Sequence, residues 1–125
     1  MNLGLKDFKR FEKQIILKNI GIKGQKKILK SKVLIIGLGG LGCPLLTYLA
    51  SSGVGTIGLV DFDRVELSNL NRQTLFNLQD IGKFKVLQAK KNIYKINRKI
   101  KIITYRKKLN SKNIQSIVKN FDIIC

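Results

Sequence analysis

Short apolar runs alternate with longer amphipathic segments along this chain, a pattern that is typical of strand–helix–strand units. Residues 33–36 and 57–60 are continuous apolar runs, as expected for strands buried on both faces of a parallel sheet. The segment between them carries leucines at helical spacing, has Pro44 in its first turn, and ends in the serine- and glycine-rich residues 51–55. The pattern therefore predicts a strand, a helix and a second strand over residues 33–60.

Further elements are predicted on both sides of this unit. Two amphipathic helices should precede it, over residues 5–17 and 22–29. A helix over residues 82–97 and a strand over residues 100–105 should follow it. A short helix capped by Ser111 and a last strand over residues 121–125 should end the series. This order predicts an α/β class with a Rossmann-like, doubly wound, mainly parallel sheet of order 3-2-1-4 over residues 31–125, after a helical arm over residues 1–30. Because the last strand would lie beside the first, we expect the domain to be incomplete.

A glycine-rich turn joins the first strand to its helix. Gly37, Gly39 and Gly42 form a G-x-G-x-x-G, and Asp61 ends the second strand 19 residues later. In dinucleotide folds the first glycine permits the tight turn, the second admits a phosphate and the third lets the helix pack closely, while the acid accepts hydrogen bonds from ribose. The context predicts nucleotide binding. A glycine-rich connection without a ligand is the alternative, and it leaves Asp61 unexplained.

Two polar features follow the second strand. Residues 61–73 concentrate carboxylates, amides and arginine, which suit ribose, phosphate and amide recognition, although a solvated loop is the simpler interpretation. Lys85 falls in the first turn of the helix expected over residues 82–97, near the carboxyl edge of the sheet. Because a helix dipole opposes a cation there, Lys85 favours a nearby phosphate.

Composition narrows the partners and the location. At 125 residues the chain holds one domain at most, and its net charge of +18 suggests nucleic acid or an acidic partner. The basic residues are mostly lysines spread along the chain, without interleaved aromatic residues, so nucleic acid is disfavoured and an acidic protein surface stays open. No signal peptide or membrane-length apolar run is visible, which predicts a cytoplasmic protein without a membrane partner.

The two cysteines do not indicate a zinc site. Cys43 and Cys125 form no C-x-x-C pair. Cys43 stands where a helix begins, a place that can lower the pKa of a thiol. A small core residue is the commoner role for such a cysteine, and we expect that role here.

Three motifs occur in the order and spacing of the ThiF/MoeB/HesA family of adenylating enzymes, which are related to ubiquitin-activating enzymes. They are RFEKQIIL from residue 10, GLGGLG from residue 37 and the most specific, DFDRVELSNLNRQ, from residue 61. The chain resembles this family from about residue 10 to residue 125. The resemblance implies a domain that binds ATP and magnesium and adenylates the C-terminal glycine of a small ubiquitin-fold sulfur-carrier protein. The glycine carboxylate attacks the α-phosphate, and pyrophosphate leaves.

The resemblance also implies roles for individual residues. Gly40 belongs to the phosphate loop with the other glycines, and Asp61 holds the ribose, with Asp63 beside it in the same motif. The residues that face the triphosphate, or lie close to it, are Asn69, Arg72, Gln73 and Lys85. The family is commonly homodimeric, and a basic residue of the arm reaches the partner's ATP. That residue is usually arginine and is Lys13 here, which keeps the charge but loses the bidentate fork.

The family's magnesium-binding aspartate and zinc-binding C-x-x-C pairs correspond to positions beyond residue 125. No metal ligand is therefore assigned in this chain, zinc is expected only in a full-length parent, and these 125 residues alone are expected not to adenylate a carrier. Two other functions stay open: a non-catalytic nucleotide-binding fragment or regulatory module, and a ThiF-like enzyme that activates a carboxylate on modified tRNA, which the charge suits. Hydride transfer to NAD is disfavoured, because residues 69–73 have no role in it.

Overall fold

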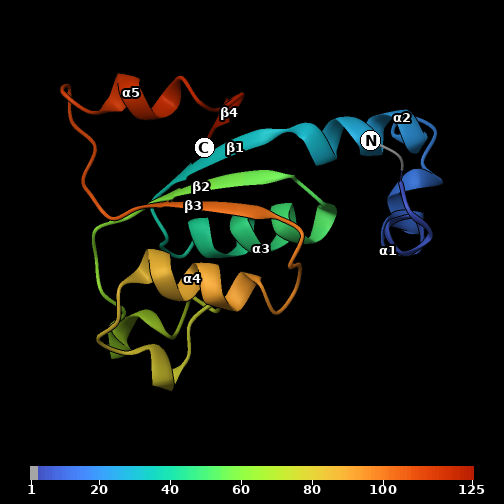
Figure 1. Cartoon of the computed structure of the whole chain (residues 1–125). Helices are drawn as coiled ribbons and strands as arrows, with labels where there is room; N and C mark the ends of the chain where they lie inside the picture. The colour runs from blue at the N-terminus through green and yellow to red at the C-terminus, as the bar shows by residue number, and fades with distance from the viewer. Residues whose placement is uncertain (1–2) are drawn as a thin grey trace.

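Four parallel strands form the sheet of the protein, in the order β3-β2-β1-β4 (Figure 1). The computed structural model describes residues 3–125. The strands are β1 (Lys32–Ile36), β2 (Thr56–Val60), β3 (Lys101–Tyr105) and β4 (Ile123–Ile124). All three neighbouring pairs are parallel, with β1 and β2 in register from Lys32 opposite Thr56 to Ile36 opposite Val60. The α/β class and the 3-2-1-4 order are therefore confirmed.

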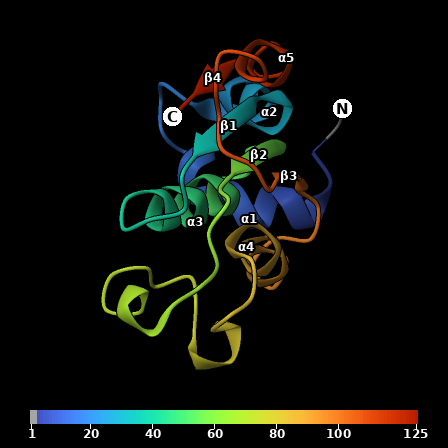
Figure 2. The ribbon, with the colours of Figure 1, turned by 90° about the vertical axis from the view of Figure 1, so that its left-hand side faces the viewer.

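Helices cover both faces of this sheet. α3 (Gly42–Ser52) and α4 (Lys85–Ile93) lie against one face, and the short α5 (Ile114–Val118) lies against the other (Figure 2). Alternation along β1 separates the two layers, because Val33 and Ile35 join the core under α3 and α4 while Leu34 joins the core under α5. The two-sided burial explains why the central strands are apolar without interruption.

The helical arm packs at the amino ends of the strands (Figure 1). It consists of α1 (Leu5–Ile15) and α2 (Gly21–Lys30). The Phe11 ring is 2% exposed and lies against Gly53 at the end of α3. Gln14 and Gln25 each donate a side-chain N–H to the Ser52 carbonyl at 3.0 Å. The arm is therefore fastened to α3 by a buried ring and by paired amides.

The crossover from β2 to α4 loops out beyond α3 and α4 in both ribbon views. It contains two 3₁₀ turns, η1 (Leu67–Asn69) and η2 (Leu78–Asp80). The helix predicted over residues 82–97 is wrong at both ends, because α4 begins at Lys85 and ends at Ile93. Residues 81–83 form a turn and Phe84 is extended, and this segment pairs with the segment after β2: the Val65 N–H donates to the Lys83 carbonyl at 2.8 Å.

Candidate nucleotide-binding site

The glycine loop runs from the end of β1 to the start of α3. Gly37 has a φ of 93°, a conformation that strongly favours glycine. Gly42 packs so closely on this turn that a Cβ there would lie 1.9 Å from the Gly37 carbonyl oxygen. A Cβ on Gly39 would meet nothing within 4 Å, whereas one on Gly40 would touch the aliphatic part of Arg72 at 3.4 Å. The loop therefore has a tight base and an open side.

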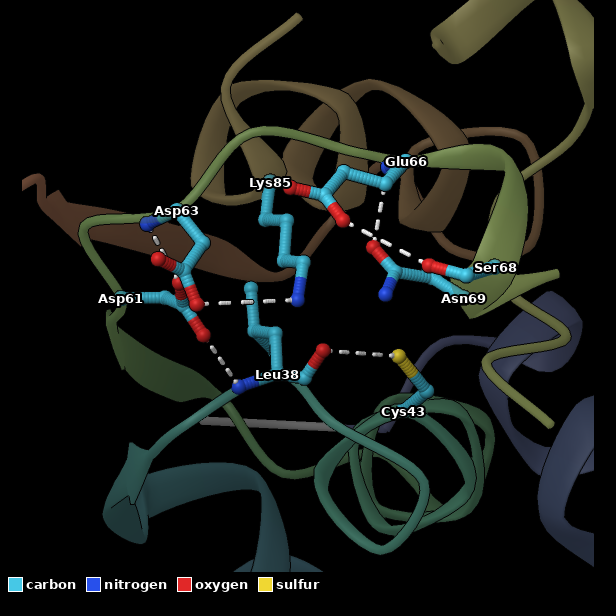
Figure 3. Close-up of polar contacts among 8 residues, drawn as sticks. All are labelled: Leu38, Cys43, Asp61, Asp63, Glu66, Ser68, Asn69 and Lys85. Carbon is cyan, nitrogen blue, oxygen red and sulfur yellow. Dashed lines mark hydrogen bonds and ion pairs between the residues drawn. The ribbon is translucent and has the colours of Figure 1, made fainter. Parts of the chain in front are cut away.

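The Asp61 carboxylate joins the end of β2 to this loop (Figure 3). Its Oδ2 accepts the Leu38 N–H at 2.8 Å, and its Oδ1 accepts the Asp63 N–H at 2.8 Å. A carboxylate offers about four lone-pair positions, so each oxygen can accept one more hydrogen bond. Asp61 is thus held in place by backbone donors and still has acceptor capacity for a ligand hydroxyl.

Lys85 is the first residue of α4 and points its ammonium toward the glycine loop (Figure 3). The residue is only 5% exposed, and its Nζ lies 4.0 Å from Asp63 Oδ2. Its backbone N–H donates to the Asp63 carbonyl at 3.0 Å. The helix dipole opposes a cation at this place, and Asp63 is the carboxylate that faces it. The position therefore favours an anion.

The polar turn around η1 presents an amide group beside Lys85, and its Arg72 side chain lies against Gly40. Asn69 Oδ1 accepts the Glu66 N–H at 2.9 Å, and its amide nitrogen points to the space that Lys85 Nζ also faces (Figure 3). Arg72 donates from Nη1 to the Ser68 carbonyl at 3.1 Å while its stem covers Gly40. The Asn69 amide nitrogen is therefore a donor aimed at the same space as the lysine.

Gln73 completes this turn and is 3% exposed. Its backbone N–H donates to the Asn69 carbonyl at 2.8 Å. Its side-chain Oε1 is buried and has no hydrogen-bond partner within residues 3–125. A buried acceptor without a donor costs about 1–3 kcal/mol, so a ligand or water that donates to it would be stabilising.

A cavity of about 230 Å³ opens at the carboxyl ends of β1 and β2. Its walls come from those strand ends and from the segment after β3: Ile36, Gly37, Val60, Asp61, Phe62, Lys107, Lys108 and Leu109. Small-molecule sites usually measure about 300–1,000 Å³, so this cavity suits one part of a nucleotide rather than all of it. The sequence did not lead us to expect residues 107–109 in the walls of the site. Their place after β3 could have indicated it, because ligands bind at the carboxyl ends of the strands in such a sheet.

Lys13 lies apart from this cluster, whereas Cys43 is buried against the glycine loop (Figure 3). Lys13 is exposed on α1, at the opposite end of the sheet from the glycine loop, so it does not join the other site residues of its own chain (Figure 1). Cys43 is fully buried, and its Sγ donates to the Leu38 carbonyl at 3.5 Å. Burial raises the pKa of the Cys43 thiol from 9.0 to about 11. The expected role of Cys43 as a small core residue, not a reactive thiol, therefore agrees with its surroundings.

No magnesium ligand is assigned among the residues that the structure describes. Within residues 3–125 no three histidine, cysteine or carboxylate side chains converge as a metal site. Across the same residues, every helix is too short or too polar to cross a membrane.

Comparison with known proteins identifies the family to which this chain belongs. The model of the ThiF family matches residues 11–125, and the chain belongs to that family. Adenylyltransferase and sulfurtransferase MOCS3 of Xenopus laevis is 42% identical over 94% of the chain, and UBA4 of Saccharomyces cerevisiae is 45% identical over 98%. The aligned part is 26% and 28% of those relatives, so the chain spans about a quarter of their length.

Solved structures agree with this assignment. PaaA superposes with a TM-score of 0.89 and 32% identity, over 98% of this chain and 41% of its own. MccB of Escherichia coli, solved with ATP, superposes with a TM-score of 0.71 and 36% identity, over 74% of this chain and 28% of its own. The resemblance read from the three motifs is thus confirmed, and the relatives include adenylyltransferases.

Proposed function

We propose that this chain is the nucleotide-binding part of an adenylyltransferase that activates the C-terminal glycine of a small ubiquitin-fold sulfur-carrier protein. The observation that carries the proposal is the convergence of Asp61, Lys85 and the open side of the glycine loop at the carboxyl ends of β1 and β2. Relatives named adenylyltransferase and sulfurtransferase, and a structural neighbour solved with ATP, support it.

In this proposal Asp61 accepts hydrogen bonds from the ribose hydroxyls, and the phosphates lie along the glycine loop. One oxygen of the glycine carboxylate attacks the α-phosphorus and forms an acyl-adenylate. The bond from the α-phosphorus to the bridging oxygen breaks, and pyrophosphate leaves with that electron pair. Negative charge grows on the leaving pyrophosphate, where Lys85 and Arg72 stabilise it. Positioning and charge neutralisation are the whole contribution of these side chains.

A second copy of the chain belongs to the same proposal. Lys13 lies on the arm, at the amino ends of the strands, and the glycine loop lies at their carboxyl ends. Its cationic side chain can therefore serve an ATP site only on a partner, which is the arrangement expected of a homodimer. Lys13 then adds one charge to the pyrophosphate side of the partner's site.

Activation of a carboxylate on modified tRNA is the alternative that the charge of +18 favours. It uses the same ATP site and a different acceptor. ATP–pyrophosphate exchange by the protein that carries this sequence separates the two: exchange stimulated by a ubiquitin-fold protein ending in glycine supports the first proposal, and exchange stimulated only by tRNA supports the second.

Equilibrium binding tests the nucleotide site itself. By calorimetry, we expect ATP to bind the chain and Lys85→Gln to weaken it about tenfold or more, the effect of losing a charged hydrogen bond. Lys83→Gln is the matched control, because Lys83 is an exposed lysine two residues away. Equal affinities in the wild type and both variants would contradict the assignment of Lys85.

A further inference from the structure

The Phe84 ring holds two arginine side chains at the carboxyl edge of the sheet. The Arg64 guanidinium carbon lies 3.8 Å from the ring centroid, and that of Arg106 lies 4.0 Å from it. Two guanidinium groups this close to one centroid occupy opposite faces of the ring. Arg64 follows β2, Phe84 directly precedes α4, and Arg106 follows β3. One half-buried ring therefore joins three segments that are far apart in the sequence.

Backbone contacts tie this stack to the candidate site. Arg64 and Phe84 form an antiparallel bridge, and Arg64 Nη1 donates to the Gly82 carbonyl at 2.7 Å. The residues on either side of the bridge belong to the site, because the Lys85 N–H donates to the Asp63 carbonyl at 3.0 Å. The backbone that carries the ring is therefore paired directly beside Asp63 and Lys85.

Lys85 needs such a support. It begins α4, where the helix dipole opposes its charge, and no side chain caps this helix start. It is also buried, so desolvation favours its retreat to solvent. A guanidinium over an aromatic face is attracted to it, and two such contacts on one ring resist the opening of the 63–65 and 82–85 segments.

We propose that Phe84, stacked with Arg64 and Arg106, is a positioning residue that holds the Lys85 ammonium at the glycine loop. The proposal deepens the proposed function and rests on it for its binding readout. Arg106 lies outside every motif that indicated the site, and its stacking on Phe84 connects it to Lys85.

Amide hydrogen exchange tests the stack without any ligand. Phe84→Leu should speed exchange of the Lys85 and Val65 amides about fivefold or more, since it removes both cation–π contacts. Exchange of the Ile35 amide in β1 should stay unchanged, which separates local opening from general loss of stability. Phe84→Tyr keeps the aromatic face and should restore slow exchange. Unchanged exchange at Lys85 and Val65 in Phe84→Leu would refute the positioning role.

A double-mutant cycle on ATP affinity then asks whether Phe84 acts through Lys85. We expect Phe84→Leu to weaken ATP about fivefold in the wild-type background and less than twofold in Lys85→Gln. Arg106→Gln should act in the same direction, and Arg98→Gln, an exposed arginine elsewhere, should not. Equal weakening in both backgrounds would overturn the proposal. If wild-type protein binds no ATP, the proposed function fails, and the exchange experiment alone decides the role of the stack.

Discussion

Alanine at Gly42 should damage the fold, and alanine at Gly39 should damage only the site. An alanine Cβ at Gly42 would stand 1.9 Å from the Gly37 oxygen and 3.0 Å from its carbonyl carbon. Ordinary contacts begin at 3.4 Å, so the backbone must move by about 1.5 Å. Overpacking costs about 1–3 kcal/mol, and a backbone partner in a tight turn places Gly42→Ala at about 3 kcal/mol. The melting temperature should then fall by about 12 °C.

Gly39→Ala is the matched control for this prediction. Its Cβ meets nothing within 4 Å, and its φ is not among the positive ones, so the unfolding free energy should change by less than about 0.5 kcal/mol. The methyl group nevertheless fills the open side of the loop, and ATP affinity should fall about tenfold or more. Urea unfolding and calorimetry measure the two effects. A wild-type melting temperature in Gly42→Ala, or wild-type ATP affinity in Gly39→Ala, would refute the assigned geometry of the loop.

Three further substitutions test other parts of the structure. Asp61→Asn should lower the unfolding free energy by about 1–3 kcal/mol and speed exchange of the Leu38 amide, because an NH₂ group replaces one charged acceptor; urea unfolding and amide exchange measure this. Burial raises the pKa of the Cys43 thiol, so the neutral thiol favours the folded state, and this contribution is complete below pH 9.0. In the wild type it should be lost as the pH rises toward about 11, whereas Cys43→Ala should show no such loss; urea unfolding at a series of alkaline pH values measures the difference. Phe11→Ala should cost about 3–5 kcal/mol in thermal unfolding, whereas Phe8→Ala, at a residue 41% exposed, should cost under about 1 kcal/mol; equal losses would argue against the packing of the arm.

The parts of the structure that depend on local patterns were predictable. The apolar runs at 33–36 and 57–60 led to β1 and β2, and the spacing of Gly37, Gly42 and Asp61 placed an acid at the glycine loop. Each of these signals is carried by neighbouring residues and by the period of a strand or helix. Sheet order followed from the same elements, because such a series of strands and helices is typical of a doubly wound sheet of order 3-2-1-4.

Contacts between distant segments were not predictable. The apolar stripe of α4 continues through Ile96, so the sequence pattern lengthened the helix, while pairing with residues 63–65 sets its true start at Lys85. Ser111 was the wrong cap for α5, because the Asn110 side chain accepts the N–H groups of the residues that precede this helix. The stack on Phe84 depends on where β3 ends, which no local pattern reveals.

The position of bound ATP is the central claim, and backbone amide shifts report it directly. Titrating ATP into ¹⁵N-labelled protein should move the amides of Leu38, Gly39 and Asp63 first, in a saturable way, and Asp61→Asn should weaken the response. The larger cavity of about 470 Å³ under the arm, which includes Asp7 and Lys99 in its walls, provides an internal comparison. Shifts confined to that cavity, or no saturable shifts at the glycine loop, would contradict the nucleotide site described above.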